Sequence, residues 1–400
     1  MIEKERQVIR ELAKKYAEIA NLPIQAERIK RLTDNNDLIA GRPPVWIEEL
    51  PWHEMNVNGE LDLVCEDPSL RWIEDYFRKI LFRWKYFQVD MVVENFFSVY
   101  KTCNSTGFGI KADEDIIKSD DANHIVSHEY HDVLATEEDL EKITLPVITA
   151  DKEQDAKNVA ELEELFGDIL PVRLRGHGTY HAPWDEISRL RGVDSLLYDL
   201  IDRPEFTHDL MDRLTNAYVA AFDQSLALGL LETNLSNMHC TPAYATNSGI
   251  WFRGMAQIFA SVSPAMHKEF DIDYAKRVYS KCGLAYYGCC EPLDTKIDML
   301  KENIPNLRKI GVSPWANEEV SAEKIGKDFV YARKPNPALV AGAFDAEVIK
   351  NETRKTVELC LKYGCSYELV LKDISTVSYK PENIFNWAKA VSETIDEYYK

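Results

Sequence analysis

The sequence predicts an α/β fold, a (β/α)8 TIM barrel preceded by an N-terminal helical and irregular extension. Beyond about residue 155, short apolar runs alternate with helical patterns of about ten to twenty residues, which is typical of parallel β/α units. Strands expected near residues 91–99 and 169–177 complete enough units for a closed barrel. The length of 400 residues suits one barrel of about 250 residues and an extension. An open doubly wound sheet is the alternative.

The later units are the clearest. Four strands are expected within the runs LAYYGCCEP, NLRKIGVSP, FVYARKPNP and YELVLKDIS. Helical patterns follow these runs, and the last one, PENIFNWAKAVSETIDEYY, closes the chain. These strands are apolar nearly throughout, as expected for a parallel sheet buried on both faces.

Residues 1–88 are assigned to the extension. Apolar residues recur at helical spacing up to about residue 36 and again over residues 68–86. Between these helices, prolines interrupt an extended aromatic strap over residues 41–55, GRPPVWIEELPWHEM. The aromatic strap could cover a second copy of the chain, so a homodimer is one expectation.

Composition restricts the class of protein. Hydrophobic residues make up 45% and charged residues 28%, which excludes a disordered or collagen-like chain. The net charge is 47 − 67 = −20, so we expect neither nucleic acid nor an anionic membrane surface as a partner. Eight cysteines are too sparse for a disulfide framework. The chain begins with a charged amphipathic pattern, and no run of about 18 apolar residues occurs. Together these features predict a cytoplasmic protein with reduced thiols.

Residues 89–400 are assigned to the barrel, with an inserted polar lobe around residues 103–155. A TIM barrel carries its active site at the carboxyl ends of its strands and in the loops that follow. Chemically capable side chains lie at these predicted positions: Glu94, His177, His181, His239, Cys240, Tyr287, Cys289, Cys290, Glu291, Trp315, Arg333, Lys334, Lys372 and Asp373.

The run YYGCCEP over residues 286–292 gives the most specific local pattern. A thiolate is a metal ligand or a nucleophile, and Glu291 could bind the same ion as Cys289 or move a proton. Alternation would place both side chains, with Tyr287, on one side of an extended strand. His239 or Cys240, one strand earlier, would complete three ligands of a catalytic zinc. The alternative is that adjacent cysteines are small apolar fillers near the rim.

Cationic and aromatic groups are candidates for binding a substrate. The stiff turn that starts at Arg333 and Lys334 suits an anionic group, although a surface turn fits as well. Lys372 and Asp373 end the last strand, either at the mouth or as a structural ion pair. Glycines flank His177 and permit close approach of a ligand, while packing roles for His177, His181 and Trp315 remain open.

Several segments resemble the uroporphyrinogen decarboxylase superfamily, which also includes zinc-dependent methyltransferases acting on methylcorrinoid proteins. The resemblance covers roughly residues 155–395, through LPVRLRGHGTYHAPWDEISRLRG, YYGCCEPLD, KIGVSPWA and LVLKDISTVSYKPENIFNW. The methyltransferases carry a His-x-Cys pair on the fifth strand and a further Cys after the eighth. This chain has Tyr287-Gly288-Cys289 and Lys372-Asp373 there, so one thiolate is kept. The N-terminal Arg-Gln-Ala-Gly-Arg stretch of the porphyrinogen decarboxylases is missing.

The resemblance implies a methyltransferase that moves a methyl group from a small methylated substrate to a corrinoid protein, with zinc and with the partner's cobalamin. The implied catalytic residues are Cys289, Glu291, His239 and Asp373, and the implied zinc ligands come from His239, Cys289, Cys290 and Glu291. The implied substrate contacts are Glu94, His177, His181, Tyr287, Trp315, Arg333, Lys334 and Lys372. Two alternatives are a metal-free decarboxylase or lyase that binds a carboxylated substrate through Arg333, Lys334 and Lys372, and a barrel that only binds a ligand or a corrinoid protein.

Overall fold

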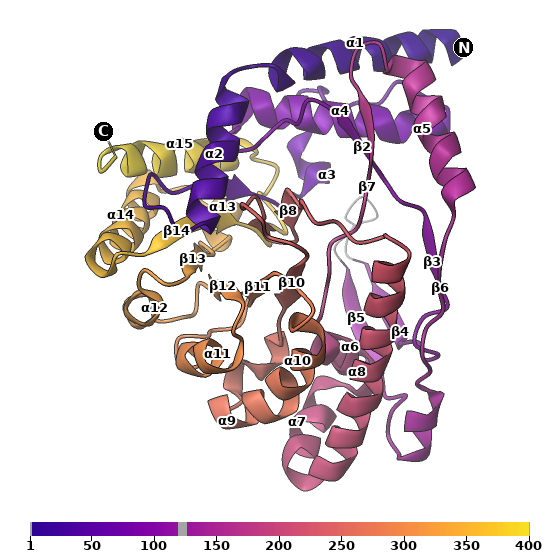
Figure 1. The fold of residues 1–400 in the computed structure, drawn as a ribbon. Helices are drawn as coiled ribbons and strands as arrows, with labels where there is room; N and C mark the ends of the chain where they lie inside the picture. Colours follow the sequence, from indigo (N-terminus) through magenta and orange to yellow (C-terminus); the bar gives the residue numbers. More distant parts are fainter. Residues whose placement is uncertain (1, 119–125, 400) are drawn as a thin grey trace.

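A computed structural model describes residues 2–118 and 126–399 and shows an α/β fold built on a six-stranded parallel sheet (Figure 1). The strand order is β1-β14-β13-β12-β11-β10. The strands are β1 (Val45–Ile47), β10 (Trp251–Gly254), β11 (Leu284–Tyr287), β12 (Leu307–Val312), β13 (Val330–Arg333) and β14 (Ser366–Leu371). In this register Arg253 lies opposite Tyr286, and Val45 lies opposite Leu369.

One face of the sheet is apolar and packs on helices. Phe252, Ile310 and Leu369 belong to a core shared with the helices that follow the strands, as alternation along a strand requires. These helices are α9 (Pro264–His267), α10 (Asp273–Tyr279), α11 (Ile297–Asn303), α12 (Glu318–Ile325), α13 (Ala338–Ala341), α14 (Ala346–Tyr363) and α15 (Glu382–Asp396). A 3₁₀ turn, η2 (Gln257–Ser261), and a π-helical turn, η3 (Lys268–Ile272), precede α10.

The opposite face is also buried, and it mixes apolar side chains with charged ones. Lys309 Nζ lies 2.9 Å from Glu368 Oε2, and both side chains are almost fully buried. A short hairpin, β8 (Asn237–Met238) and β9 (Thr241–Pro242), covers this face, and Lys309 donates to Thr241 Oγ1 at 2.7 Å. A paired and hydrogen-bonded charge avoids the large cost of a lone buried one.

The N-terminal helices form a second, aromatic core. Helices α1 (Ile2–Ala20), α4 (Pro68–Tyr86) and α5 (Lys152–Phe166) lie side by side at the top of Figure 1 and bury Tyr16, Phe77 and Phe166. Asp67 caps α4 by accepting from Ser69 N, which is a favourable helix start. The remaining N-terminal helices are α2 (Ile24–Asn36) and α3 (Trp52–Met55).

A parallel pair, β2 (Phe97–Tyr100) and β7 (Val172–Arg175), lies beside this aromatic core. Isolated bridges from His177 to Leu231 and from His181 to Gly254 connect it toward β10. Among the described residues these ladders do not close into a ring, so the expected eight-stranded barrel is not shown. The strand expected at 91–99 begins only at Phe97, because the preceding backbone bonds to side chains of α2: Arg28 donates to Met91 O and Val93 N donates to Gln25.

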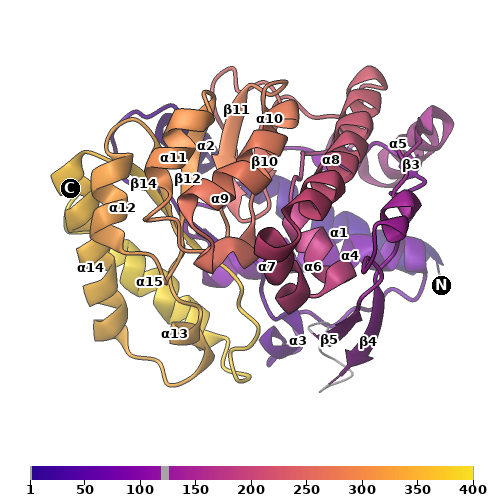
Figure 2. The ribbon, with the colours of Figure 1, turned by 90° about the horizontal axis from the view of Figure 1, so that it is seen from below.

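Two antiparallel strand pairs lie between β2 and β7 in the sequence: β3 (Cys103–Ser105) with β6 (Ile148–Ala150), and, between these two strands, β4 (Asp113–Ile117) with β5 (Ser127–His131). Residues 119–125 of the expected lobe lie outside the described residues. Figure 2 shows β5 beside α6 (Pro183–Arg191), which packs with α7 (Val193–Asp202) and α8 (Pro204–Ala227). A 3₁₀ turn, η1 (Glu138–Lys142), follows the second hairpin.

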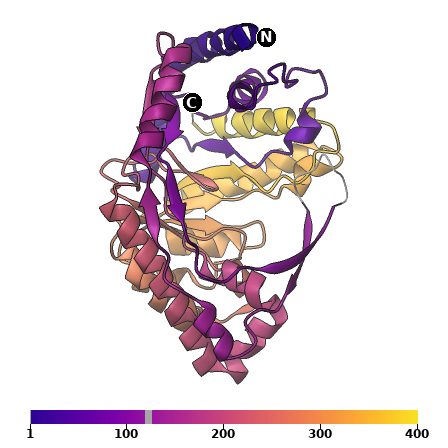
Figure 3. The ribbon, with the colours of Figure 1, turned by 90° about the vertical axis from the view of Figure 1, so that its right-hand side faces the viewer.

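The N-terminal helices and the α6–α8 group lie at opposite ends of the molecule, with the sheet between them (Figure 3). Within the described chain, we find no helix with both the length and the apolar character that crossing a bilayer requires.

Candidate active site

The carboxyl ends of the parallel strands meet at one edge of the sheet, where open α/β sheets bind their ligands. Thiol, imidazole, carboxylate and ammonium groups gather there. They come from the segments after β1 (Glu48 and Glu49), β11 (Cys289–Glu291), β13 (Lys334) and β14 (Lys372 and Asp373), together with Arg253 of β10. The turn of the β8–β9 hairpin adds His239 and Cys240.

Three of these side chains form a donor set for a metal ion. One ligand atom from each of His239, Cys240 and Cys289 lies within 4.8 Å of the other two. Both cysteines are buried and His239 is exposed, so the set opens to solvent on the imidazole side. Cys290 Sγ lies 3.6 Å from Cys289 Sγ. We refer to His239, Cys240, Cys289 and Cys290 as the thiol cluster.

The environment of Cys289 stabilises a thiolate. Hydrogen bonds with Cys240 and Cys290, and then the charges of Lys372 and Arg253, hold the pKa of Cys289 far below its ordinary value. Lys372 Nζ lies 3.2 Å and Arg253 Nη2 3.9 Å from Cys289 Sγ. The pKa values of Cys240 and Cys290 are raised by their hydrogen bonds with Cys289, and then by burial. The cluster therefore concentrates its negative charge on one sulfur.

Two carboxylates border the thiol cluster on its open side. Asp373 Oδ2 accepts from Cys290 Sγ at 3.1 Å and lies 2.9 Å from Lys372 Nζ. Glu49 Oε1 lies 3.4 Å from His239 Nε2, and Glu49 Oε2 accepts from Asp373 N at 3.0 Å. Burial raises the pKa of Glu49 although Lys372 opposes this shift. Glu49 thus links the thiol cluster to the segment after β14.

The backbone at the site adopts uncommon conformations. Glu49, Cys240 and Asp373 have φ values of 53°, 69° and 56°, a region that residues with a side chain rarely occupy. Such residues cost about 1–3 kcal/mol each and cluster at functional sites. Gly288 has φ 112°, and a Cβ there would lie 2.7 Å from Leu293 Cδ1 and 3.2 Å from Gly311. Only glycine therefore fits between Tyr287 and Cys289.

The turn at Gly288 corrects the expectation that Tyr287, Cys289 and Glu291 share one side of an extended strand. Strand β11 ends at Tyr287, whose hydroxyl points to the helix-covered face. This hydroxyl donates to Asp271 Oδ2 at 2.5 Å and lies 2.6 Å from His267 Nε2. Tyr287 is therefore part of a buried polar network behind the sheet.

Glu291 holds the backbone of Cys289. Its Oε2 accepts from Cys289 N at 2.9 Å, while its buried Oε1 has no partner among the described residues. Burial, and then the charge of Cys289, raises the pKa of Glu291 to about 7. Glu291 is not part of the donor set formed by His239, Cys240 and Cys289.

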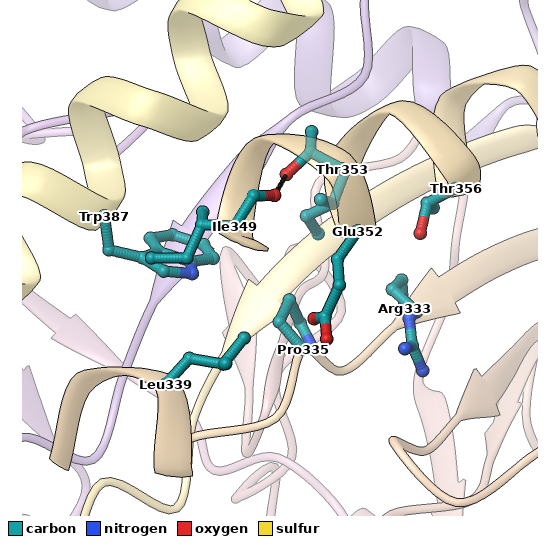
Figure 4. Close-up of a pocket in the computed structure, with 9 residues that line it drawn as sticks. Arg333, Pro335, Leu339, Ile349, Glu352, Thr353, Thr356 and Trp387 are labelled. Atoms are coloured by element: carbon teal, nitrogen blue, oxygen red, sulfur yellow. Dashed lines mark hydrogen bonds between the residues drawn. The ribbon is translucent and has the colours of Figure 1, made fainter. Parts of the chain in front are cut away.

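Strand alternation separates the two neighbouring cations at the end of β13. Lys334 faces the thiol cluster and donates to Cys240 O at 2.5 Å. Arg333 faces the helices, where it donates to Ser313 O at 2.7 Å and pairs with Glu318 at 3.3 Å. Figure 4 shows Arg333 at a cavity of only about 10 Å³, beside Glu352. The structure therefore places Lys334, but not Arg333, at the site.

Four further candidate residues lie away from the thiol cluster or on an open loop. His177 bonds to Lys101 O at 2.7 Å, and Glu94 pairs with Arg175 at 3.1 Å. His181 is buried between aromatic rings, and both of its ring nitrogens lack a partner in the described part of the chain; burial lowers its pKa to about 4. Trp315 is 69% exposed after β12.

Sequence reasoning missed three residues of the site, namely Arg253, Glu48 and Glu49. Arg253 is a fully buried cation in the otherwise apolar strand WFRG, and a charge in such a strand is itself an indication of function. Glu49 lies in the aromatic strap, and it reaches the site because β1 pairs with β14. That pairing joins residues that are far apart in the sequence.

No protein-family model matches the chain, and no curated protein sequence matches it. Among solved structures, the chain is similar to one described as a methyltransferase from Methanosarcina mazei. The two share 14% sequence identity with a TM-score of 0.51, and the match covers 93% of this chain and 99% of the other. At this identity, the likeness shows a shared fold.

Proposed function

We propose that this protein is a methyltransferase that moves a methyl group from a small methylated substrate to the cobalt of a separate corrinoid protein. The observation that carries the proposal is the donor set of His239, Cys240 and Cys289 at the carboxyl ends of the strands. The fold shared with a protein described as a methyltransferase supports it. In the reaction, the bond from the heteroatom to the methyl carbon breaks, a methyl–cobalt bond forms, and the heteroatom keeps the electron pair and takes up a proton.

The donor set fits zinc. Catalytic zinc sites take three protein ligands and leave a fourth position open, and two cysteines with one histidine are a known combination. His239, Cys240 and Cys289 supply these atom types, and the exposed imidazole marks the open side. Zinc bound there would act as a Lewis acid toward the leaving heteroatom of the substrate.

The other residues of the site prepare this arrangement. Lys372 and Arg253 balance the negative charge of Cys289, and Glu291 fixes the backbone at Cys289. Asp373, which accepts from Cys290, lies near the open side as a hydrogen-bond acceptor. In this proposal Lys334 and Lys372 attract an anionic part of the substrate. We also propose a (β/α)8 barrel as the underlying architecture. Its eight strands would be those of the open six-stranded sheet and of the parallel pair β2–β7.

The test is methyl transfer to chemically reduced cob(I)alamin from a panel of methoxylated aromatic compounds and methylamines, followed by the absorbance of methylcobalamin. Zinc-loaded wild-type protein should transfer with at least one of them, and Cys289→Ala should be slower by more than about tenfold. Cys282→Ala, which changes a thiol bonded to Val278 O outside the site, should transfer at the wild-type rate. An unchanged rate in Cys289→Ala would overturn the proposal.

A metal-free decarboxylase or lyase is a second candidate, favoured by the convergence of Lys334, Lys372 and Arg253 on the thiol cluster. Three cations at one strand edge suit a carboxylated substrate. Release of CO₂ from candidate acids by chelator-treated protein, without any corrinoid, would support this candidate over methyl transfer.

A further inference from the structure

A second cavity of about 930 Å³ lies between α4, α5 and the strand β2. These elements lie together at the upper right of Figure 1. Pockets of about 300–1,000 Å³ hold small organic ligands. The cavity lining includes none of the thiol cluster residues, so this space is separate from the candidate active site.

The outer wall of this cavity is aromatic. Trp72, Tyr76 and Tyr100 line it and are 52%, 36% and 58% exposed. The rings of Trp72 and Tyr76 lie 5.8 Å and 5.2 Å from the buried ring of Phe97, which supports them from beneath. Three exposed rings around one cavity form an apolar patch of the kind that marks a ligand-binding groove. Open aromatic faces attract cations through their quadrupole.

The inner end of the cavity carries an ion pair between Arg175 and Glu94. The two partners differ in how many further hydrogen bonds they can make. All three guanidinium nitrogens of Arg175 are used: Nη1 bonds to Glu94 and Ser236, Nη2 donates to Asn234 O at 2.7 Å, and Nε pairs with Glu232 at 3.5 Å. Glu94 Oε1 accepts from Arg175 and from Tyr244, each at 3.3 Å, while Oε2 accepts one bond among the described residues, from Arg175 at 3.1 Å. A carboxylate oxygen accepts more than one hydrogen bond, so Glu94 can receive another donor.

Glu94 also links this cavity to a neighbouring one. A space of about 420 Å³ shares Glu94 and Arg175 with it and is lined by Arg173 and Tyr244. The Glu94 side chain is more exposed than that of Arg175, at 22% against 12%. The carboxylate is therefore the member of the pair that a ligand reaches first.

We propose that the cavity between α4, α5 and β2 binds an organic ammonium ion with an apolar body. The aromatic wall formed by Trp72, Tyr76 and Tyr100 receives the apolar part and the positive charge, and Glu94 pairs with the cation at the inner end. The net charge of −20 further attracts cations over anions.

Calorimetric titration with benzyltrimethylammonium tests this proposal, with phenylacetate as an anion of similar size. The wild-type protein should bind the cation and not the anion. Trp72→Ala and Glu94→Gln should each weaken cation binding by about fivefold to tenfold, the range for a lost cation–π contact or charge pair. Because Trp72 is half exposed, Trp72→Ala should keep the wild-type circular dichroism spectrum, so this variant remains informative if Glu94→Gln fails to fold.

Trp315→Ala is the matched control, since it removes another exposed tryptophan outside this cavity. It should bind the cation with wild-type affinity. Equal binding of phenylacetate, wild-type affinity in Trp72→Ala, or a loss of binding in Trp315→Ala instead would overturn the proposal.

Discussion

Replacing Lys372 by methionine tests the electrostatic account of the thiol cluster. At 3.2 Å between Lys372 Nζ and Cys289 Sγ, opposite unit charges interact by about 5 kcal/mol at an effective dielectric constant of about 20. One pKa unit corresponds to about 1.4 kcal/mol, so the upper limit is a shift of about four units. Asp373, 2.9 Å from Lys372, offsets part of this charge. We expect Lys372→Met to raise the pKa of Cys289 by about one to four units.

The assay is the ultraviolet absorbance of the thiolate as a function of pH in metal-free protein. Subtracting the curve of Cys289→Ala isolates this thiol. Lys362→Met is the control, because Lys362 pairs with Glu319 on the surface at 2.7 Å and should leave the curve unchanged. A Cys289 titration that is the same in Lys372→Met and in the wild type would refute the reasoning.

Three further predictions concern stability. Tyr287→Phe should lower the free energy of unfolding by about 1–3 kcal/mol, because buried Asp271 loses a hydrogen-bond donor. Chemical denaturation measures this change, and the zinc content of the variant should equal that of the wild type. In metal-free protein, the contribution of Glu291 to stability should fall as pH rises from about 4 to 7, because folded Glu291 keeps its proton up to a pKa of about 7 while the unfolded carboxyl loses it near about 4.3. The free energy of unfolding of the wild type, taken relative to that of Glu291→Gln, should therefore decrease by up to about 3 kcal/mol over this range. Glu368→Gln should cost about 3–5 kcal/mol, because it leaves Lys309 buried and unpaired, and a wild-type denaturation midpoint would contradict this.

The α/β character and the later strands are predictable from local pattern. Strands β11, β12 and β13 lie inside the runs that predict them, and β14 begins one residue before its run, at Ser366, because parallel strands buried on both faces are mostly apolar. The rule that carboxyl ends of parallel strands share one edge then brings Cys289 and Lys372 together without further information.

Details that depend on distant contacts are not predictable in this way. The irregular strap contains β1, which forms only because residues 45–47 pair with β14, and this pairing brings Glu49 to the site. The face of the sheet to which a side chain at a strand end points also depends on the residue at which the strand ends. Lys334 faces the thiol cluster while Arg333 faces helices, and the turn at Gly288 separates Tyr287 from Cys289.

The zinc content of the purified protein tests the central claim most directly. If His239, Cys240 and Cys289 form a zinc site, elemental analysis should find about one zinc ion per chain in the wild type and in Cys282→Ala, and almost none in Cys289→Ala. Equal zinc content in the wild type and Cys289→Ala, whether near zero or near one ion per chain, would contradict the account.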